Sequence, residues 1–166
     1  MKALTLWQPW AQLVALNQKR IETRGWQTNY RGLLAIHSAV KMTPGQKEIL
    51  DMEPFASALT DFFATGADLP LGAMVAVCHL KAIMPTRGLL TRGLLPLGGT
   101  DGFIGGVKWE LTANERAFGD YSDGRFGWLL ANIQPLDVPI PCKGAQGLWN
   151  VSPQILEQIS KQVNLK

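Results

Sequence analysis

A nearly continuous apolar run at residues 71–80, Leu-Gly-Ala-Met-Val-Ala-Val-Cys-His-Leu, constrains the fold of this chain most strongly. A run that is apolar on both faces is typical of a strand buried on both sides. The chain has 166 residues, which suits one compact domain and predicts a single domain over residues 1–166. We therefore expect this strand to lie at the centre of a sheet.

Shorter strands and helices surround this run in irregular succession. Apolar patterning predicts further strands at residues 4–7, 19–26, 31–38, 127–138 and 148–151. We expect the strands at 19–26 and 31–38 to pair with each other. Helical spacing predicts a short helix after Pro9, a long helix after Thr43-Pro44 that is kinked or split at Pro54, and a C-terminal helix capped by Ser152-Pro153. This pattern favours an α+β fold around a small barrel over a doubly wound sheet.

Residues 84–106 differ from the segments around them. They contain Pro85, Pro96 and many glycines, and the pentapeptide Thr-Arg-Gly-Leu-Leu at residues 86–90 recurs at 91–95. Five residues repeated once are too short for a solenoid. We therefore expect a loop or insertion over residues 84–106.

Composition excludes several classes of protein. The chain is 46% hydrophobic and 17% charged, which excludes general disorder. No window approaches the roughly 18–20 apolar residues of a membrane-spanning helix, and no signal-peptide pattern follows the first strand, so we expect a cytoplasmic protein without a membrane partner. Cys78 and Cys142 are far apart, which predicts two reduced thiols and neither a metal site nor another cofactor.

The positive charge is concentrated in the N-terminal third of the chain. Residues 1–50 carry seven basic and two acidic side chains, whereas residues 51–108 and 109–166 each carry one more acidic than basic residue. A basic region attracts polyanions, nucleic acid first among them, although the same cations could be scattered over a solvated surface.

The densest polar run, Lys-Arg-Ile-Glu-Thr-Arg-Gly-Trp at residues 19–26, follows the first helix. In a strand, Glu22, Arg24 and Trp26 share one face, and Lys19 can join Glu22 only from the turn before the strand or through a bulge. One interpretation is an exposed edge strand whose alternating charges prevent edge-to-edge association. The other interpretation is a functional site.

Three motifs occur in order along the first part of the chain: Leu-Trp-Gln-Pro-Trp-Ala at 6–11, Lys-x-x-Glu-x-Arg at 19–24, and Tyr-Arg-Gly-x-Leu-x-Ile-His-Ser at 30–38. They resemble the ASCH domain (activating signal cointegrator homology) of the PUA-like superfamily. The hallmark of that family is Gly-x-Lys-x-x-Glu-x-Arg, and this chain has Asn17 at the glycine position. Asparagine at a helix end can adopt the left-handed conformation that glycine supplies. The resemblance covers most of the chain except roughly residues 84–106.

The resemblance implies a small PUA-like β-barrel with helices inserted between its strands and a C-terminal helix. It also implies a cleft that binds nucleic acid, RNA more than DNA, or a nucleotide. There, basic side chains can meet phosphates, Glu22 can accept from a base amine or hold Arg24, and aromatic rings can stack on an unpaired base. The candidate nucleic-acid-binding residues are Lys19, Arg24, Trp26, Arg31, Trp10, Tyr121, Arg125 and Trp149. Each tryptophan could instead belong to the core.

Three alternatives to simple binding stay open. A metal-independent ribonuclease would use Glu22 as the base and Lys19 with Arg24 to stabilise negative charge. The resemblance also extends to nucleoside amidohydrolases that use a Lys, a Thr and a distant Glu. Here Glu22 stands at the Thr position and Thr23 points to the opposite strand face, which weakens that alternative. A protein-interaction module would present residues 84–106 to a partner that the sequence does not identify.

Overall fold

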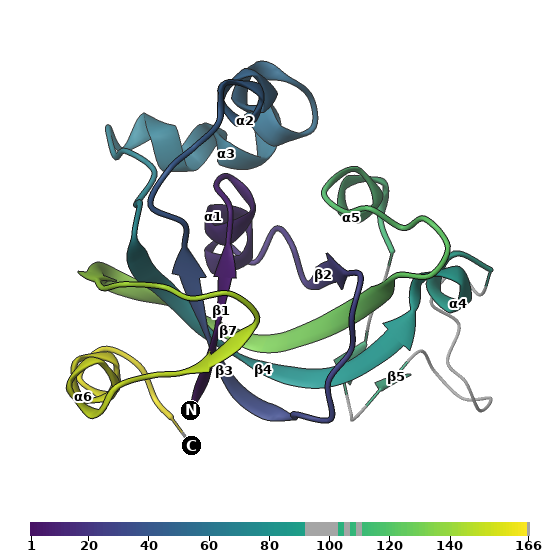
Figure 1. Cartoon of the computed structure of the whole chain (residues 1–166). Coiled ribbons are helices and arrows are strands. Elements are labelled where there is room, and N and C mark those ends of the chain that lie inside the picture. The colour runs from purple at the N-terminus through teal and green to yellow at the C-terminus, as the bar shows by residue number, and fades with distance from the viewer. Residues whose placement is uncertain (92–102, 105–106, 109–110, 166) are drawn as a thin grey trace. The chain divides into compact units, whose positions relative to one another are not determined.

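The computed structural model describes residues 1–91, 103–104, 107–108 and 111–165. The chain divides into two compact units (Figure 1). The first unit contains residues 1–18, 33–78 and 133–166, and the second unit contains residues 19–32 and 79–132. The long strands β4 (Ala73–Pro85) and β7 (Phe126–Pro141) belong partly to each unit. That residues 1–166 form a single domain stays a prediction.

The strands of the first unit include β1 (Lys2–Leu6), β3 (Gly32–Ser38) and β8 (Leu148–Asn150). Strand β1 pairs with β3 in parallel and with β8 antiparallel. Among the described residues, the main sheet has six strands in the order β2-β7-β4-β3-β1-β8. Residues 73–80 of the apolar run that the sequence places at the centre of the sheet form the start of β4, whose first six residues are all buried, as expected. Leu71, the first residue of the run, lies before the strand and is exposed.

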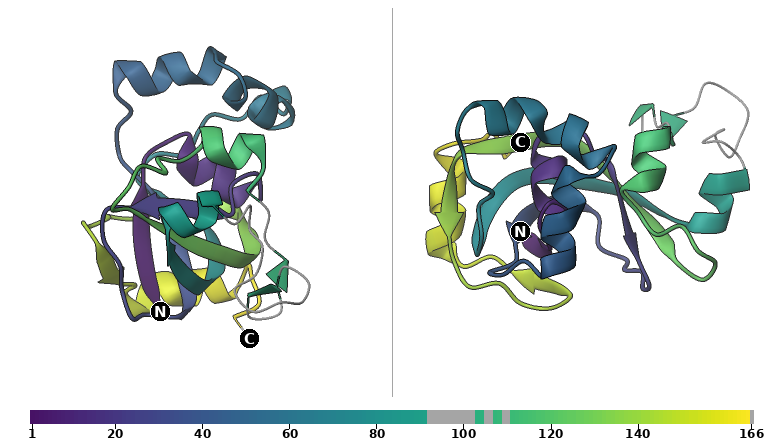
Figure 2. Two further views of the ribbon diagram at one scale, coloured as in Figure 1. Left: turned by 90° about the vertical axis from the view of Figure 1, so that its right-hand side faces the viewer. Right: turned by 90° about the horizontal axis from the view of Figure 1, so that it is seen from above.

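Two helices of the first unit begin at capping residues that the sequence marks. The helices of this unit are α1 (Trp10–Ala15), α2 (Pro44–Glu48), the 3₁₀ helix η1 (Ile49–Asp51), α3 (Phe55–Ala64) and α6 (Pro153–Ser160). Thr43 and Gln46 form a capping box at the start of α2, and the Ser152 hydroxyl accepts from the Ile155 N–H at the start of α6. The helical region after Thr43 is split before Pro54, as predicted. In Figure 2, α2 and α3 lie at one end of this unit and α6 at the other.

Asn17 ends helix α1 in the left-handed conformation, with φ of 56°. The Asn17 N–H donates to the Val14 carbonyl and the Gln18 N–H donates to the Leu13 carbonyl, which is the hydrogen-bond pattern of a Schellman cap. The conformational role expected for the residue at the family's glycine position is therefore confirmed. The cap turns the chain out of the helix directly before Lys19.

The second unit contains β2 (Ile21–Arg24), α4 (Thr86–Thr91), β5 (Phe103–Ile104), β6 (Val107–Lys108) and α5 (Ala113–Ala117). Strand β2 pairs antiparallel with the start of β7, with Glu22 opposite Trp128 and Arg24 opposite Phe126. A small apolar core holds this unit together. Its buried members are Ile21, Leu89, Tyr121, Leu129 and Ala131.

The structure differs from two sequence-based expectations. The pairing of residues 19–26 with residues 31–38 is wrong, because β2 pairs with β7 and β3 pairs with β1. In the segment expected to be a loop or insertion, residues 84–85 continue β4 and residues 86–91 form α4. Residues 92–102 and 105–106 lie outside the described part of the chain, so the expectation for them stays a prediction.

The α+β class and the C-terminal helix are confirmed, since strands and helices follow one another irregularly along the chain. None of the helices within residues 1–91 and 111–165 has the length and apolar character that crossing a membrane requires.

Candidate functional site

Lys19 occupies the turn between α1 and β2, and its side chain is fully buried. The ammonium donates to the Ile21 carbonyl, and Nζ lies 3.6 Å from Oε2 of Glu22. The lysine therefore reaches the glutamate from the turn before the strand, which is one of the two routes that strand alternation allows.

Glu22 connects this buried lysine to an arginine that is partly exposed. Its second carboxylate oxygen, Oε1, lies 3.1 Å from Nε of Arg24, whose side chain is 26% exposed. Glu22 itself is only 8% exposed. Buried charges persist in proteins when they are paired, and here the pairing runs from Lys19 through Glu22 to Arg24. Strand β2 does lie at the edge of the sheet, as one interpretation of residues 19–26 expected. That interpretation is wrong about exposure, because the first three residues of β2 are buried.

A second buried carboxylate, that of Glu115, supports the same segment from α5. It accepts hydrogen bonds from the backbone N–H groups of Arg20 and Ile21, the latter at 3.4 Å, and it is 5% exposed. Burial raises the pKa of Glu115, and the charge of Lys19 and the two backbone donors oppose that shift. The sequence analysis missed this residue. Thr112-x-x-Glu115 is a helix-start pattern, and the Thr112 hydroxyl does accept from the Glu115 N–H, but no pattern links it to Arg20, 95 positions earlier.

Tyr121 lies beside both carboxylates. Its side chain is 9% exposed, and within the described residues its buried hydroxyl has no hydrogen-bond partner. Burial raises the pKa of Tyr121, and the negative charges of Glu115 and Glu22 raise it further. The structure therefore places Tyr121 near Glu22 of the Lys19–Glu22–Arg24 network, and its expected role in nucleic-acid binding stays a prediction.

Arg125 follows Tyr121 by four residues, and its side chain is held in place by Asp120 and Thr23. Its Nε lies 3.2 Å from Oδ2 of Asp120 and donates to the Asp120 carbonyl, and Nη2 donates to the Thr23 carbonyl at 3.4 Å. A Cβ on Gly25 would lie 3.9 Å from Nη1 of Arg125. This guanidinium therefore lies next to the backbone that joins Arg24 to Trp26.

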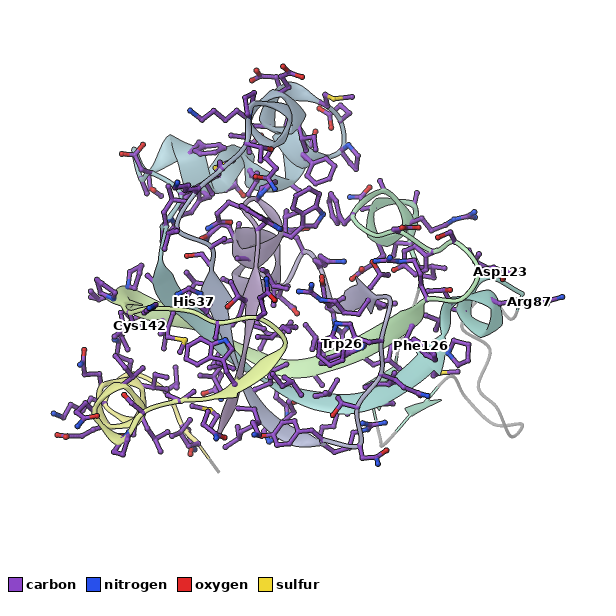
Figure 3. All side chains as sticks on the ribbon, viewed as in Figure 1. Trp26, His37, Arg87, Asp123, Phe126 and Cys142 are labelled. Carbon is purple, nitrogen blue, oxygen red and sulfur yellow. The ribbon has the colours of Figure 1, made fainter. Side chains whose placement is uncertain are left out.

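Trp26 follows β2 and is 37% exposed. Its ring meets that of the fully buried Trp128 edge to face, with centroids 4.6 Å apart, and Nε1 of Trp128 donates to the Trp26 carbonyl at 3.2 Å. Figure 3 labels Trp26 and Phe126, the residue opposite Arg24 in the β2–β7 ladder. Further along this loop, the exposed Arg31 donates from Nη1 to the Thr28 and Tyr30 carbonyls.

Trp10 and Trp149 have their own contacts in the first unit. The Trp10 ring packs edge to face with Phe55 at 5.9 Å. Nε1 of Trp149 lies 3.2 Å from the Thr5 hydroxyl, and its ring lies 5.6 Å from that of His37. These contacts stabilise the first unit, and a role for either tryptophan in nucleic-acid binding stays a prediction.

The amidohydrolase and ribonuclease alternatives each require particular side chains to be available, and the structure shows what those side chains contact. In the amidohydrolase, a threonine hydroxyl beside a lysine would be the nucleophile. Thr23 instead accepts a hydrogen bond from the Asp120 N–H, and the Lys19 ammonium faces Glu22. In the ribonuclease, Glu22 would be the base, and each of its oxygens already faces a cation. Among the residues that the structure describes, no group of three His, Cys, Asp or Glu side chains could hold a metal ion.

The family model of the ASCH domain matches residues 4–89. A crystal structure of ASCH from Zymomonas mobilis is similar over 96% of this chain and 93% of that chain, with 13% identity and a TM-score of 0.52. A tyrosine-to-phenylalanine mutant of the Zymomonas mobilis protein is similar over 96% of each chain, with 13% identity and a TM-score of 0.51. At this identity the likeness shows the fold alone, and it confirms the expected PUA-like α+β fold. No curated protein matches this chain.

Proposed function

Because the chain belongs to the ASCH domain family, which is thought to bind RNA, we propose that it binds RNA through its second compact unit. The observation that carries this proposal is the buried Lys19–Glu22 pair, which holds the partly exposed guanidinium of Arg24. Arginine in a fixed orientation suits phosphate, because its planar group offers several donors in one fork.

The distribution of charge between the two units also favours RNA binding by the second unit. Residues 19–32 and 79–132 contain ten basic and six acidic residues, a net charge of +4. The remaining residues contain six basic and seven acidic residues, a net charge of −1. The net positive charge of the chain therefore belongs to the unit that carries the network, and a positive field attracts RNA.

Within this proposal, Lys19 acts indirectly. An ammonium with no exposed surface does not meet a phosphate, so Lys19 fixes Glu22, and Glu22 in turn fixes Arg24. Contacts to RNA come from the side chains with exposed surface. Arg31 is exposed, and the Arg125 side chain is 31% exposed.

A binding measurement with charge-removing variants tests the proposal. We expect a labelled RNA oligonucleotide to bind at low salt, and more tightly than DNA of the same sequence. Arg24→Gln should weaken this binding roughly tenfold, because it removes one charged hydrogen bond to phosphate. Lys47→Gln removes one charge from an exposed position on α2 in the first unit and should leave the affinity unchanged. Equal affinities for wild type and Arg24→Gln would reject this assignment of the site.

A further inference from the structure

His37, on β3, is a histidine that the first unit buries almost completely, with 1% of its surface exposed. Its Nε2 atom lies 3.1 Å from the Cys142 carbonyl, and Figure 3 shows the two residues near each other. A carbonyl oxygen only accepts hydrogen bonds, so Nε2 carries the proton of the neutral ring. The second ring nitrogen, Nδ1, is therefore the atom that a further proton would occupy.

The surroundings of Nδ1 do not suit that further proton. The atom is buried and has no hydrogen-bond partner among the residues that the structure describes. Gly144 lies close to it, since a Cβ on Gly144 would stand 2.6 Å from Nδ1. A proton on Nδ1 would make it a buried, charged donor without an acceptor, which is unfavourable.

The neighbouring elements of the first unit also bring no negative charge to the ring. On β1, Thr5 lies opposite the histidine in the ladder, and on β8 the Trp149 ring meets it edge to face at 5.6 Å. The ionisable groups nearby are the buried Cys78 thiol on β4, the Cys142 thiol and the exposed ammonium of Lys143. Burial raises the pKa of both thiols, so these groups are neutral or positive. Burial lowers the pKa of the histidine itself.

The 142–147 loop, which follows β7 and leads to β8, faces this nitrogen through Gly144. The Thr5 hydroxyl donates to the Ala145 carbonyl at 2.9 Å, and the Cys142 N–H donates to the Gly72 carbonyl at 3.0 Å. Four of the six residues of the loop are exposed. A segment that buries little surface opens locally at a low cost in free energy.

We infer that His37 is a proton-operated latch: the neutral ring holds the 142–147 loop closed, and protonation of Nδ1 releases the loop from Cys142 onward. This inference does not depend on RNA binding, and it gives the first unit a response to acid. In the open loop the hydrated ring takes a proton near the ordinary pH of 6.5. The closed state excludes that proton, so it is most stable above pH 6.5 and loses stability as the pH falls.

Hydrogen exchange from about pH 7.5 to about pH 5 tests the latch. The reporter is the Cys142 N–H, which the bond to Gly72 protects in the closed loop. Its protection factor, corrected for the intrinsic pH dependence of exchange, measures the open population. His37→Gln keeps a side-chain N–H that can donate to the Cys142 carbonyl but takes up no proton. His79→Gln, which removes the other histidine of the chain, is the matched control.

In wild type and in His79→Gln, the protection factor should fall below pH 6.5 by about tenfold per pH unit, because opening is linked to one proton, until the pKa of His37 in the closed state is reached. In His37→Gln it should be the same at every pH. A constant protection factor in wild type, or an equal fall in His37→Gln, would overturn the inference. A fall shared equally by the buried amides of β3 would indicate global unfolding and would overturn it too.

An NMR titration of wild type keeps the inference testable if His37→Gln does not fold. The ring resonances of His37 should titrate with a midpoint below pH 6.5, and the amide resonances of the 142–147 loop should shift with the same midpoint. Titration of the ring without any shift of the loop amides would overturn the inference.

Discussion

The ammonium of Lys19 lies 3.6 Å from the carboxylate of Glu22, and the side chains of the two residues are 0% and 10% exposed. Removing two charges from water costs several kcal/mol for each ion, so such a pair is stable only when both partners are present. The pair also fixes the oxygen that faces Arg24.

Lys19→Met should therefore destabilise the protein by about 3–5 kcal/mol, because it leaves Glu22 buried without its cation. Chemical denaturation measures this loss. The double variant Lys19→Met, Glu22→Leu should recover part of it, since the buried Glu22 carboxylate that lost its ammonium is removed as well. Lys161→Met breaks an exposed ion pair with Glu157 and should leave the free energy of unfolding unchanged. A Lys19→Met protein as stable as wild type would refute the structural role of the ammonium.

The effect of Glu115 on stability should depend on pH. Burial raises its pKa above the ordinary value of 4.5, so above that pH the folded state binds the proton more tightly than the unfolded state. Stability contributed by such a group decreases as the pH rises from 4.5 through the folded pKa. We therefore expect the stability advantage of wild type over Glu115→Gln to shrink as the pH increases from 4 to 7. Urea titrations at several pH values measure it, and an advantage that grows with pH would contradict the role of burial.

Gly144 packs closely against the ring of His37 in the first unit. A Cβ there would stand 2.6 Å from Nδ1 of His37 and 2.9 Å from the Thr5 hydroxyl. Gly144→Ala should destabilise the protein by about 1–3 kcal/mol through overpacking. Gly45→Ala on α2, where no atom lies within 4 Å of the new Cβ, is the matched control and should not destabilise. Thermal unfolding compares the two variants, and equal melting temperatures would show that the loop moves away freely.

RNA incubated with the pure protein and a chelator should stay intact. Both oxygens of Glu22 face a cation, which suits an anchor for Arg24 better than a general base. Gel analysis of end-labelled RNA measures cleavage. Cleavage that disappears in Glu22→Gln would make this protein a ribonuclease and would change the role of Glu22 from anchor to base.

Local signals in the sequence predicted much of the fold. The cap residues Thr43 and Ser152, the break at Pro54 and the left-handed Asn17 depend on neighbours within a few residues, so the sequence displays them directly. The start of β4 was also predictable, because a strand buried on both faces is apolar throughout.

Contacts between distant residues were not predictable in the same way. Residues 31–38 were the nearest partner for β2 along the chain, but β4 and β1 occupy both sides of β3 in the sheet, and β2 pairs instead with β7. The burial of Lys19 depends on that pairing and on α5, whose Glu115 reaches the start of β2 from far along the chain. Charge alone predicted either an exposed strand or a functional site, and the burial of Lys19 and Glu22 contradicts the exposed strand.

The salt dependence of RNA affinity tests the central claim, RNA binding by the Arg24-bearing unit, most directly. The logarithm of the association constant should fall steeply and linearly with the logarithm of the salt concentration, because bound phosphates release counterions. Arg24→Gln should make that slope shallower by about one, the value for one lost phosphate contact, while Lys47→Gln leaves it unchanged. A flat plot for wild type, or identical slopes for wild type and Arg24→Gln, would contradict the account.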